Sequence, residues 1–147
     1  MHYTSSMKET KDDQTISWLL MQLMFQSKHR LAELSERHEI TGMQSATLRM
    51  LSKDDPKAMR TLSDYFMCDA STVTGIVDRL EARHLIRRSN HATDRRVKLL
   101  TLTDEGERVK QSILADTLRA ETERLNTLLS KEEREGLRKI LIRIVED

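Results

Sequence analysis

Hydrophobic side chains recur every three or four residues along most of the chain, the spacing that gathers them on one face of an amphipathic helix. This spacing predicts a long first helix over residues 13–38, and its length indicates that it reaches across a partner. A second helical stretch covers residues 104–147 and is interrupted at Ser130, which has the capping-box spacing with Glu133. The hydrophobic stripe of this second stretch includes Leu125, Leu129, Leu137, Ile140, Leu141 and Ile144.

Shorter helices are predicted between these two stretches. Thr41 and Gln44 have the spacing of a capping box, so one helix should begin there. Another should begin near Thr61, where Thr61 and Asp64 suggest a cap.

Asp69 follows as the expected cap of a further helix, because its carboxylate can accept hydrogen bonds from the free N–H groups of the first turn. We expect this helix to cover residues 70–83. Four apolar residues at helical spacing form its inward stripe, which consists of Val73, Ile76, Val77 and Leu80.

After this helix the pattern changes to a period of two, which predicts strands. One strand should run from Leu85 to Ser89 and the other from Val97 to Thr103, with a polar loop between them. The two strands form a hairpin that carries Arg95 and Arg96 at its tip.

Two short helices joined by a three-residue turn, followed by such a hairpin, form a winged helix-turn-helix over residues 41–103, with the wing over residues 85–103. The predicted fold class is therefore mainly α with a small β-hairpin wing. Long N- and C-terminal helices, which we expect to serve dimerisation, flank this part. A length of 147 residues fits a single domain, 1–147.

Composition narrows the class of protein further. No apolar run approaches the roughly 20 residues that a membrane span needs, and the N-terminal residues lack a signal-peptide pattern. The single cysteine excludes an internal disulfide framework. We therefore expect a cytoplasmic protein with no membrane partner.

The net charge of +1 conceals an uneven distribution. Between Ala70 and Leu100, seven basic residues stand against three acidic ones, so this segment carries +4. Such a basic island is typical of a surface that binds a polyanion, and also of an ordinary solvated surface. Charge alone does not decide between the two. The basic residues are Arg79, Arg83, Arg87, Arg88, Arg95, Arg96 and Lys98.

The second helix of the pair suits the major groove of DNA. Ser71 and Thr72 lie at its N-terminus, where free N–H groups and hydroxyls favour phosphate. Thr74 can reach a base edge or a thymine methyl. Gly75 either permits close approach to DNA or is a tolerated surface residue. Arg79 lies on the same outward face.

The tip of the wing suits the minor groove, whose negative potential attracts arginine. Arg95 and Arg96 are the residues placed to enter it. Asp94 would repel DNA if exposed, so we expect it to brace an arginine through a salt bridge.

An ordered series of short motifs resembles the MarR family of transcriptional regulators, and the resemblance covers nearly the whole chain. It begins with Leu62-Ser63-Asp64, continues through the helix from Ser71 to Glu81, and includes Leu85-Ile86-Arg87-Arg88. The series ends with Asp94-Arg95-Arg96 and then Leu102-Thr103-Asp104-Glu105-Gly106.

This resemblance implies a homodimer that binds double-stranded DNA at a pseudo-palindromic operator. Each subunit would place its recognition helix in a major groove and its wing in a minor groove. Members of the family usually repress transcription, and many release DNA when a small phenolic or lipophilic effector binds. The effector site itself is not identified by the sequence.

Two residues depart from the family pattern. Met67 stands in the turn between the paired helices, and His84 follows the recognition helix, both at places where the family often has glycine. A left-handed backbone at such helix ends favours glycine, so we expect slight local strain.

Redox sensing and metal sensing have weaker support in the sequence than DNA binding. Cys68 invites a redox interpretation, but its apolar neighbours favour a small buried hydrophobe. The five histidines show no close ligand spacing, although His29 and Glu33 share a helix face, so neither a metal nor a cofactor is expected. Redox or metal sensing by the same fold remains an alternative.

Other protein classes fit less well. No Gly-rich phosphate loop, nucleophile elbow or paired-carboxylate frame indicates an enzyme. A helical protein-interaction module without DNA binding is a further alternative, but such a module has no need for two arginines at a hairpin tip.

Overall fold

The computed structural model describes residues 15–146 and confirms a mainly α fold with a small antiparallel sheet. It contains six helices and three strands over these residues. In chain order they are α1 (Ile16–Glu36), α2 (Gly42–Met50), β1 (Lys57–Ala58), α3 (Met59–Phe66), α4 (Ala70–Ala82), β2 (Ile86–Asn90), β3 (Lys98–Leu102), α5 (Asp104–Leu128) and α6 (Lys131–Val145).

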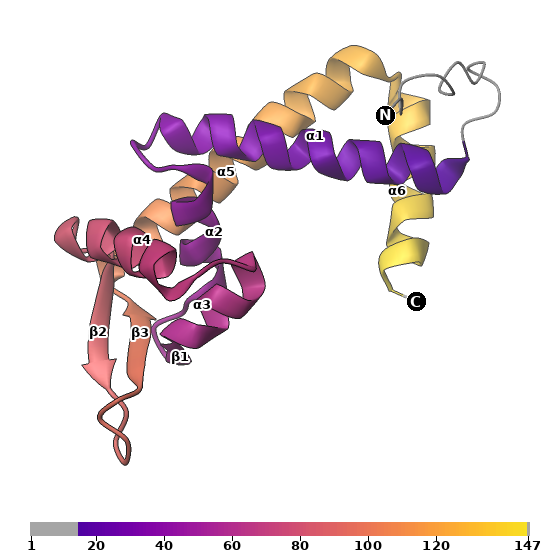
Figure 1. Ribbon diagram of the computed structural model, residues 1–147. Helices are drawn as coiled ribbons and strands as arrows, with labels where there is room; N and C mark the ends of the chain where they lie inside the picture. The colour runs from indigo at the N-terminus through magenta and orange to yellow at the C-terminus, as the bar shows by residue number, and fades with distance from the viewer. Residues whose placement is uncertain (1–14, 147) are drawn as a thin grey trace, which may run out of the picture.

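The chain divides into a lobe and an arm of long helices (Figure 1). The lobe contains α2, α3, α4 and the sheet, and the arm consists of α1, α5 and α6. Nearly all of the buried apolar side chains lie in the lobe, and α5 reaches them through Ile113. The core residues are Ile40, Leu48, Leu51, Leu62, Val73, Ile76, Val77, Leu80, Leu85, Ile86, Leu100, Leu102 and Ile113.

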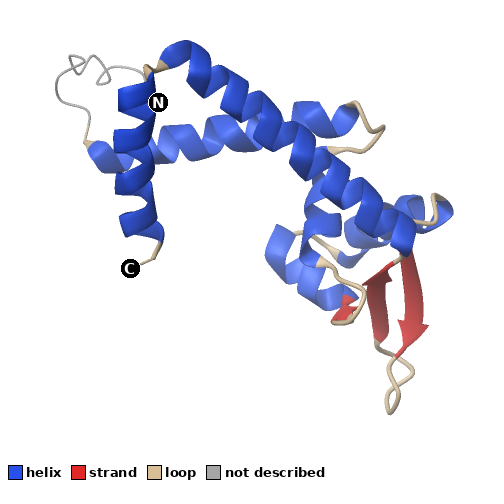
Figure 2. Cartoon of the chain, turned by 180° about the vertical axis from the view of Figure 1, so that it is seen from behind, coloured by secondary structure: helices blue, strands red, loops and turns tan. Residues whose placement is uncertain are grey.

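The sheet has the strand order β1-β3-β2, and all of its pairs are antiparallel. β2 and β3 form the predicted hairpin, with Ile86 opposite Leu102, and this hairpin projects from the lobe (Figure 2). β1 pairs with the other edge of β3 through Lys57 and Ala58 and was not predicted. Two residues are too few to show an alternating pattern.

Most helix starts agree with the predicted caps. Capping boxes form at Thr41 and at Ser130, and Asp69 caps α4. The predicted cap at Thr61 is wrong, because α3 begins two residues earlier and has Ala58 at its N-cap without a side-chain hydrogen bond. Ala58 also belongs to β1, so pairing with β3, and not a capping side chain, sets this helix start.

Left-handed backbone occurs where the departures from the family pattern predicted it. Met67 has φ 49° and His84 has φ 57°, and both follow the end of a helix. Glu39, with φ 57°, is a third such residue and was not predicted. The left-handed backbone expected at Met67 and His84 is therefore confirmed, and each non-glycine residue in this region costs about 1 kcal/mol.

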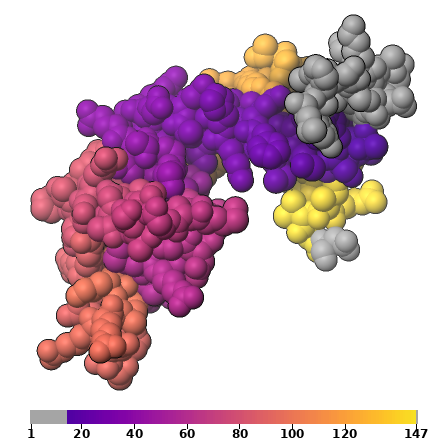
Figure 3. Space-filling view, in the orientation of Figure 1, coloured from indigo at the N-terminus to yellow at the C-terminus, as the bar shows by residue number. Residues whose placement is uncertain are grey.

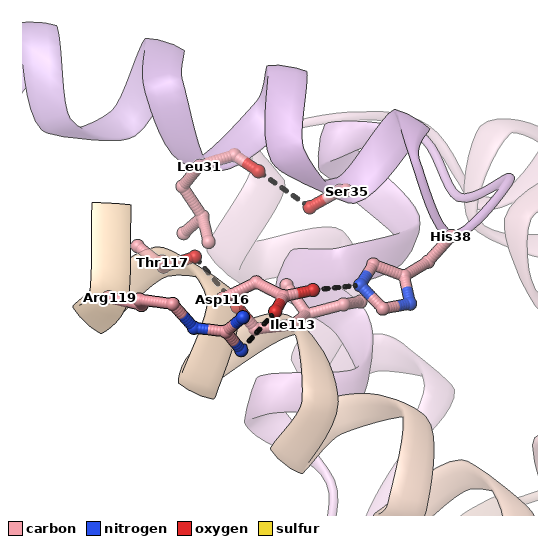
Figure 4. Close-up of polar contacts among 7 residues, drawn as sticks. All are labelled: Leu31, Ser35, His38, Ile113, Asp116, Thr117 and Arg119. Carbon is pink, nitrogen blue, oxygen red and sulfur yellow. Dashed lines mark hydrogen bonds and ion pairs between the residues drawn. The ribbon is translucent and has the colours of Figure 1, made fainter. Parts of the chain in front are cut away.

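Polar contacts within the arm join α1 and the loop that follows it to α5. The His38 ring nitrogen Nε2 lies 2.9 Å from Asp116 Oδ2, and the same carboxyl group accepts from Arg119 at 2.9 Å (Figure 4). Farther along the arm, Arg30 pairs with Glu121. These contacts hold the two long helices of the arm, α1 and α5, together. Within residues 15–146, no helix is both long and apolar enough to cross a membrane.

Candidate nucleic-acid interface

The N-terminus of α4 is built around Asp69. Its Oδ1 accepts from the Thr72 backbone N–H at 2.7 Å and from the Ser71 hydroxyl at 2.7 Å. These hydrogen bonds, first that of the Ser71 hydroxyl and then that of the Thr72 N–H, hold the pKa of Asp69 below its usual range. The carboxylate therefore occupies donors that we expected to meet phosphate. Ser71 and Thr72 remain exposed, and contact with DNA through them stays a prediction.

The outward face of α4 is polar but offers few free donors. Thr74 is exposed, and its hydroxyl donates to the Ala70 carbonyl at 2.8 Å. The hydroxyl hydrogen is therefore already used within the helix, whereas the γ-methyl takes part in no hydrogen bond. A β-carbon at Gly75 would meet no atom within 4 Å, so the fold itself does not require glycine there. Arg79 is exposed and makes no ion pair within the described part of the chain.

The tip of the wing carries Arg95 and Arg96, both exposed. Asp94 does not brace them as predicted, since no ion pair of residues 15–146 includes it. Instead, Asp94 Oδ1 accepts from the Arg96 backbone N–H at 3.0 Å, and its carbonyl accepts from the Val97 N–H at 3.0 Å. A short aspartate side chain readily bonds to the backbone two residues on, which shapes a tight turn. Asp94 thus fixes the path of the loop and leaves both guanidinium groups free.

The basic island separates into structural and free cations. Arg88 is half-buried and pairs with Asp78 and Glu81, which joins the wing to α4. Arg83 donates to the carbonyl oxygens of Glu39 and His38 at 2.6 and 3.2 Å. The sequence did not indicate these roles, because they depend on which elements the fold brings together. Within residues 15–146, Arg88 is the only member of the island that makes an ion pair, and Arg79, Arg87, Arg95 and Arg96 make neither an ion pair nor a hydrogen bond through their guanidinium groups.

An open hollow of about 550 Å³ separates the N-terminal half of α4 from the wing. Three cations border it, namely Arg60 from α3 and Arg96 and Lys98 from the wing. Sequence reasoning missed the contribution of α3, because only the fold places that helix beside the wing. The other lining residues are Ala58, Met59, Ser63, Asp64, Ala70, Val73, Thr74 and Val97.

The alternative sensor sites find little support in the described residues. No group of three or more histidine, cysteine, aspartate or glutamate side chains among residues 15–146 could hold a metal ion. His29 and Glu33 form an exposed pair at 3.4 Å. Cys68 is half-buried and packs against the core of the lobe, as expected of a small hydrophobe.

The arm presents apolar side chains that the chain itself does not cover. No residue of α6 is buried, and 53% of Ile140 and 56% of Ile144 is exposed. In α1, Leu19, Leu23 and Phe25 are also exposed. The predicted dimerisation residues Leu137 and Leu141 belong to the same surface, while Leu125 and Leu129 are half-buried.

Comparison with known proteins agrees with this architecture. Residues 40–98 match the sequence model of the MarR family. The HTH-type transcriptional repressor MdtR of Bacillus subtilis is 34% identical over 98 residues, which cover 66% of this chain and 63% of that protein, or somewhat less than two thirds of its length.

Among solved structures, the YusO protein of Bacillus subtilis is 28% identical with a TM-score of 0.68, and the match covers 90% of this chain and 99% of that one. A variant of Staphylococcus aureus MepR bound to an oligodeoxyribonucleotide is 24% identical with a TM-score of 0.66, over 91% of this chain and 98% of that one. At 24% identity, the likeness to MepR shows a shared fold alone.

Proposed function

Because the chain belongs to the MarR family, whose members are transcriptional regulators and not enzymes, we propose that it is a sequence-specific DNA-binding repressor. The observation that carries this proposal is the set of unpaired arginines on the recognition helix and at the wing tip. Arg79, Arg95 and Arg96 are exposed and free of ion pairs within residues 15–146, so they can neutralise phosphates and release counterions.

In the proposed complex, α4 lies in a major groove and the wing in the adjacent minor groove. The DNA strand between these grooves then crosses the hollow that separates α4 from the wing. There Arg60, Arg96 and Lys98 are placed to meet its phosphates. The DNA-bound relative MepR has the same fold, which supports this arrangement.

We further propose that the active form is a homodimer joined through α1, α5 and α6. The two recognition helices would then read half-sites about one helical turn, or 34 Å, apart on a pseudo-palindromic operator. Figure 3 shows open space beneath α1 between the lobe and α6, so the apolar surface of the arm is accessible to a second copy. A small phenolic or lipophilic effector that releases DNA is part of the proposal through the family resemblance.

Fluorescence anisotropy with labelled DNA from upstream of the protein's own gene tests the function. We expect steep salt dependence and a preference of about a thousandfold or more over a scrambled duplex. In the same assay, Arg95→Ala should weaken operator binding by at least about fivefold, equivalent to about 1 kcal/mol.

Lys131→Ala is the matched control, because it removes an exposed cation from the start of α6, far from the wing. Equal binding by Arg95→Ala and the parent would contradict the role of the wing. Absence of binding even at low salt would contradict DNA binding and favour the interaction-module alternative.

Gly75→Ala separates the two interpretations of this glycine. The fold has room for the added methyl, so the free energy of unfolding should rise by about 0.5–1 kcal/mol, the usual gain when alanine replaces glycine in a helix interior. If α4 approaches DNA closely, operator affinity should nevertheless fall by at least about fivefold. Chemical denaturation and anisotropy measure the two effects. Unchanged DNA affinity of Gly75→Ala would make Gly75 a tolerated surface residue.

A further inference from the structure

We propose that Thr74 selects thymine in each operator half-site by contact between its γ-methyl and the thymine methyl. The inference rests on the proposed function, since it assigns a base to the recognition helix. It decides between the two roles open to Thr74 on sequence alone, contact with a polar base edge or with a thymine methyl.

The hydroxyl of Thr74 is already used inside the helix. It has a single hydrogen, which it donates to the Ala70 carbonyl one turn earlier at 2.8 Å. The side chain is therefore held by its own helix, and it has no hydrogen left for the N7 or O6 atom of a purine or the O4 atom of thymine.

The residues nearest to Thr74 on α4 add no free hydroxyl group. The Ser71 hydroxyl donates to Asp69 at 2.7 Å, and Gly75 has no side chain. Ala70 and Val97 line the same hollow as Thr74, where the charged donors are Arg60, Arg96 and Lys98. Those cations come from α3 and the wing, so the γ-methyl of Thr74 is what this part of α4 itself presents to DNA.

The major groove has one apolar group that distinguishes a base, the C5-methyl of thymine. A methyl group with no free hydroxyl hydrogen beside it therefore favours thymine over the bases that lack a C5-methyl group. Burying a methyl group stabilises by about 0.8 kcal/mol, so loss of the contact should reduce affinity about fourfold in each half-site.

Deoxyuridine substitution tests this directly, because it removes the thymine methyl and preserves every hydrogen-bonding group. The full-length protein is first used to select a preferred duplex from a random-sequence library. Each thymine of that duplex is then replaced in turn by deoxyuridine, and affinity is measured by anisotropy. We expect one position per half-site at which the replacement weakens binding about fourfold.

Two variants assign the effect to Thr74. Thr74→Val keeps the methyl and loses the hydroxyl, so it should retain both the affinity and the deoxyuridine effect. Thr74→Ser keeps the hydroxyl and loses the methyl in both half-sites, so it should bind the thymine duplex about fifteenfold more weakly and no longer respond to deoxyuridine. Thermal unfolding of both variants verifies that they are folded.

The opposite pattern would overturn the inference. If Thr74→Val loses affinity and Thr74→Ser does not, the hydroxyl contacts a base edge or a phosphate. A deoxyuridine effect that is absent, or that persists in Thr74→Ser, also excludes the methyl contact and leaves DNA binding intact. Selection of no preferred duplex would remove the proposed function and the inference with it.

Discussion

Gly106→Ala is expected to lower the free energy of unfolding by at least about 3 kcal/mol, although alanine is the better helix former. Gly106 lies in the first turn of α5 and is buried. A β-carbon there would lie 1.9 Å from the carbonyl oxygen of Leu85 and 2.9 Å from its carbonyl carbon. Both are backbone atoms, so no side-chain rotation can relieve the overlap, and α5 must move away from the start of the wing.

That movement is costly because several hydrogen bonds meet at this point. The Leu85 carbonyl accepts from the Thr103 N–H at 3.1 Å, and the Leu85 N–H donates to the Leu80 carbonyl at 3.0 Å. The Thr103 hydroxyl donates to the carbonyl of the left-handed residue His84 at 2.6 Å. Separating α5 from the wing would therefore disturb the end of α4 as well.

Urea unfolding measures the effect through the change in midpoint at constant slope. Gly75→Ala is the control, since its added methyl meets open space on α4 and should stabilise by about 0.5–1 kcal/mol. If Gly106→Ala were as stable as the parent, the close approach of α5 to Leu85 would be contradicted.

The same position illustrates what the sequence can and cannot predict. A periodic pattern identified every long helix and both strands of the hairpin, because each buries one face along its length. The capping residues Thr41, Asp69 and Ser130 were also predictable, since a cap acts within four residues. The requirement for glycine at position 106 depends on a carbonyl group of residue 85, and local spacing holds no information about that contact.

The errors at the candidate site have the same origin. Asp94 was expected to pair with an arginine, but the backbone of its own turn offered a nearer donor. The free and structural arginines of the basic island are indistinguishable in sequence, and only the fold brings Arg88 to Asp78 and Glu81. The contribution of Arg60 to the hollow likewise depends on α3 lying beside the wing.

Leu141→Asp is expected to dissociate the proposed homodimer. Leu141 lies in α6, a helix of 15 residues that has no buried residue in the single chain. Leu141 is 39% exposed in the single chain, so the area that it can still bury in the homodimer contributes about 1 kcal/mol per copy, and two copies are lost together. The dimer dissociation constant should therefore rise at least about thirtyfold, and further because the two new carboxylates would be buried without partners.

The lobe should survive this change, because its core receives Ile113 and the partly buried Val109 from α5 and no residue from α6. Analytical ultracentrifugation over a range of concentrations measures the dimer, and circular dichroism reports whether the lobe stays folded. Lys139→Asp is the control, since residues two apart on a helix do not share a face and the new carboxylate remains in water.

Loss of the dimer should also weaken operator binding, because a monomer can engage one half-site only and forfeits the gain from linking two. A Leu141→Asp protein that remained a stable dimer and bound the operator like the parent would show that α6 does not form the dimer interface. A protein that became monomeric and kept full operator affinity would instead contradict the two-half-site arrangement, while the proposed dimer interface through α6 would stand. The two readouts together thus separate the interface from the way it serves DNA binding.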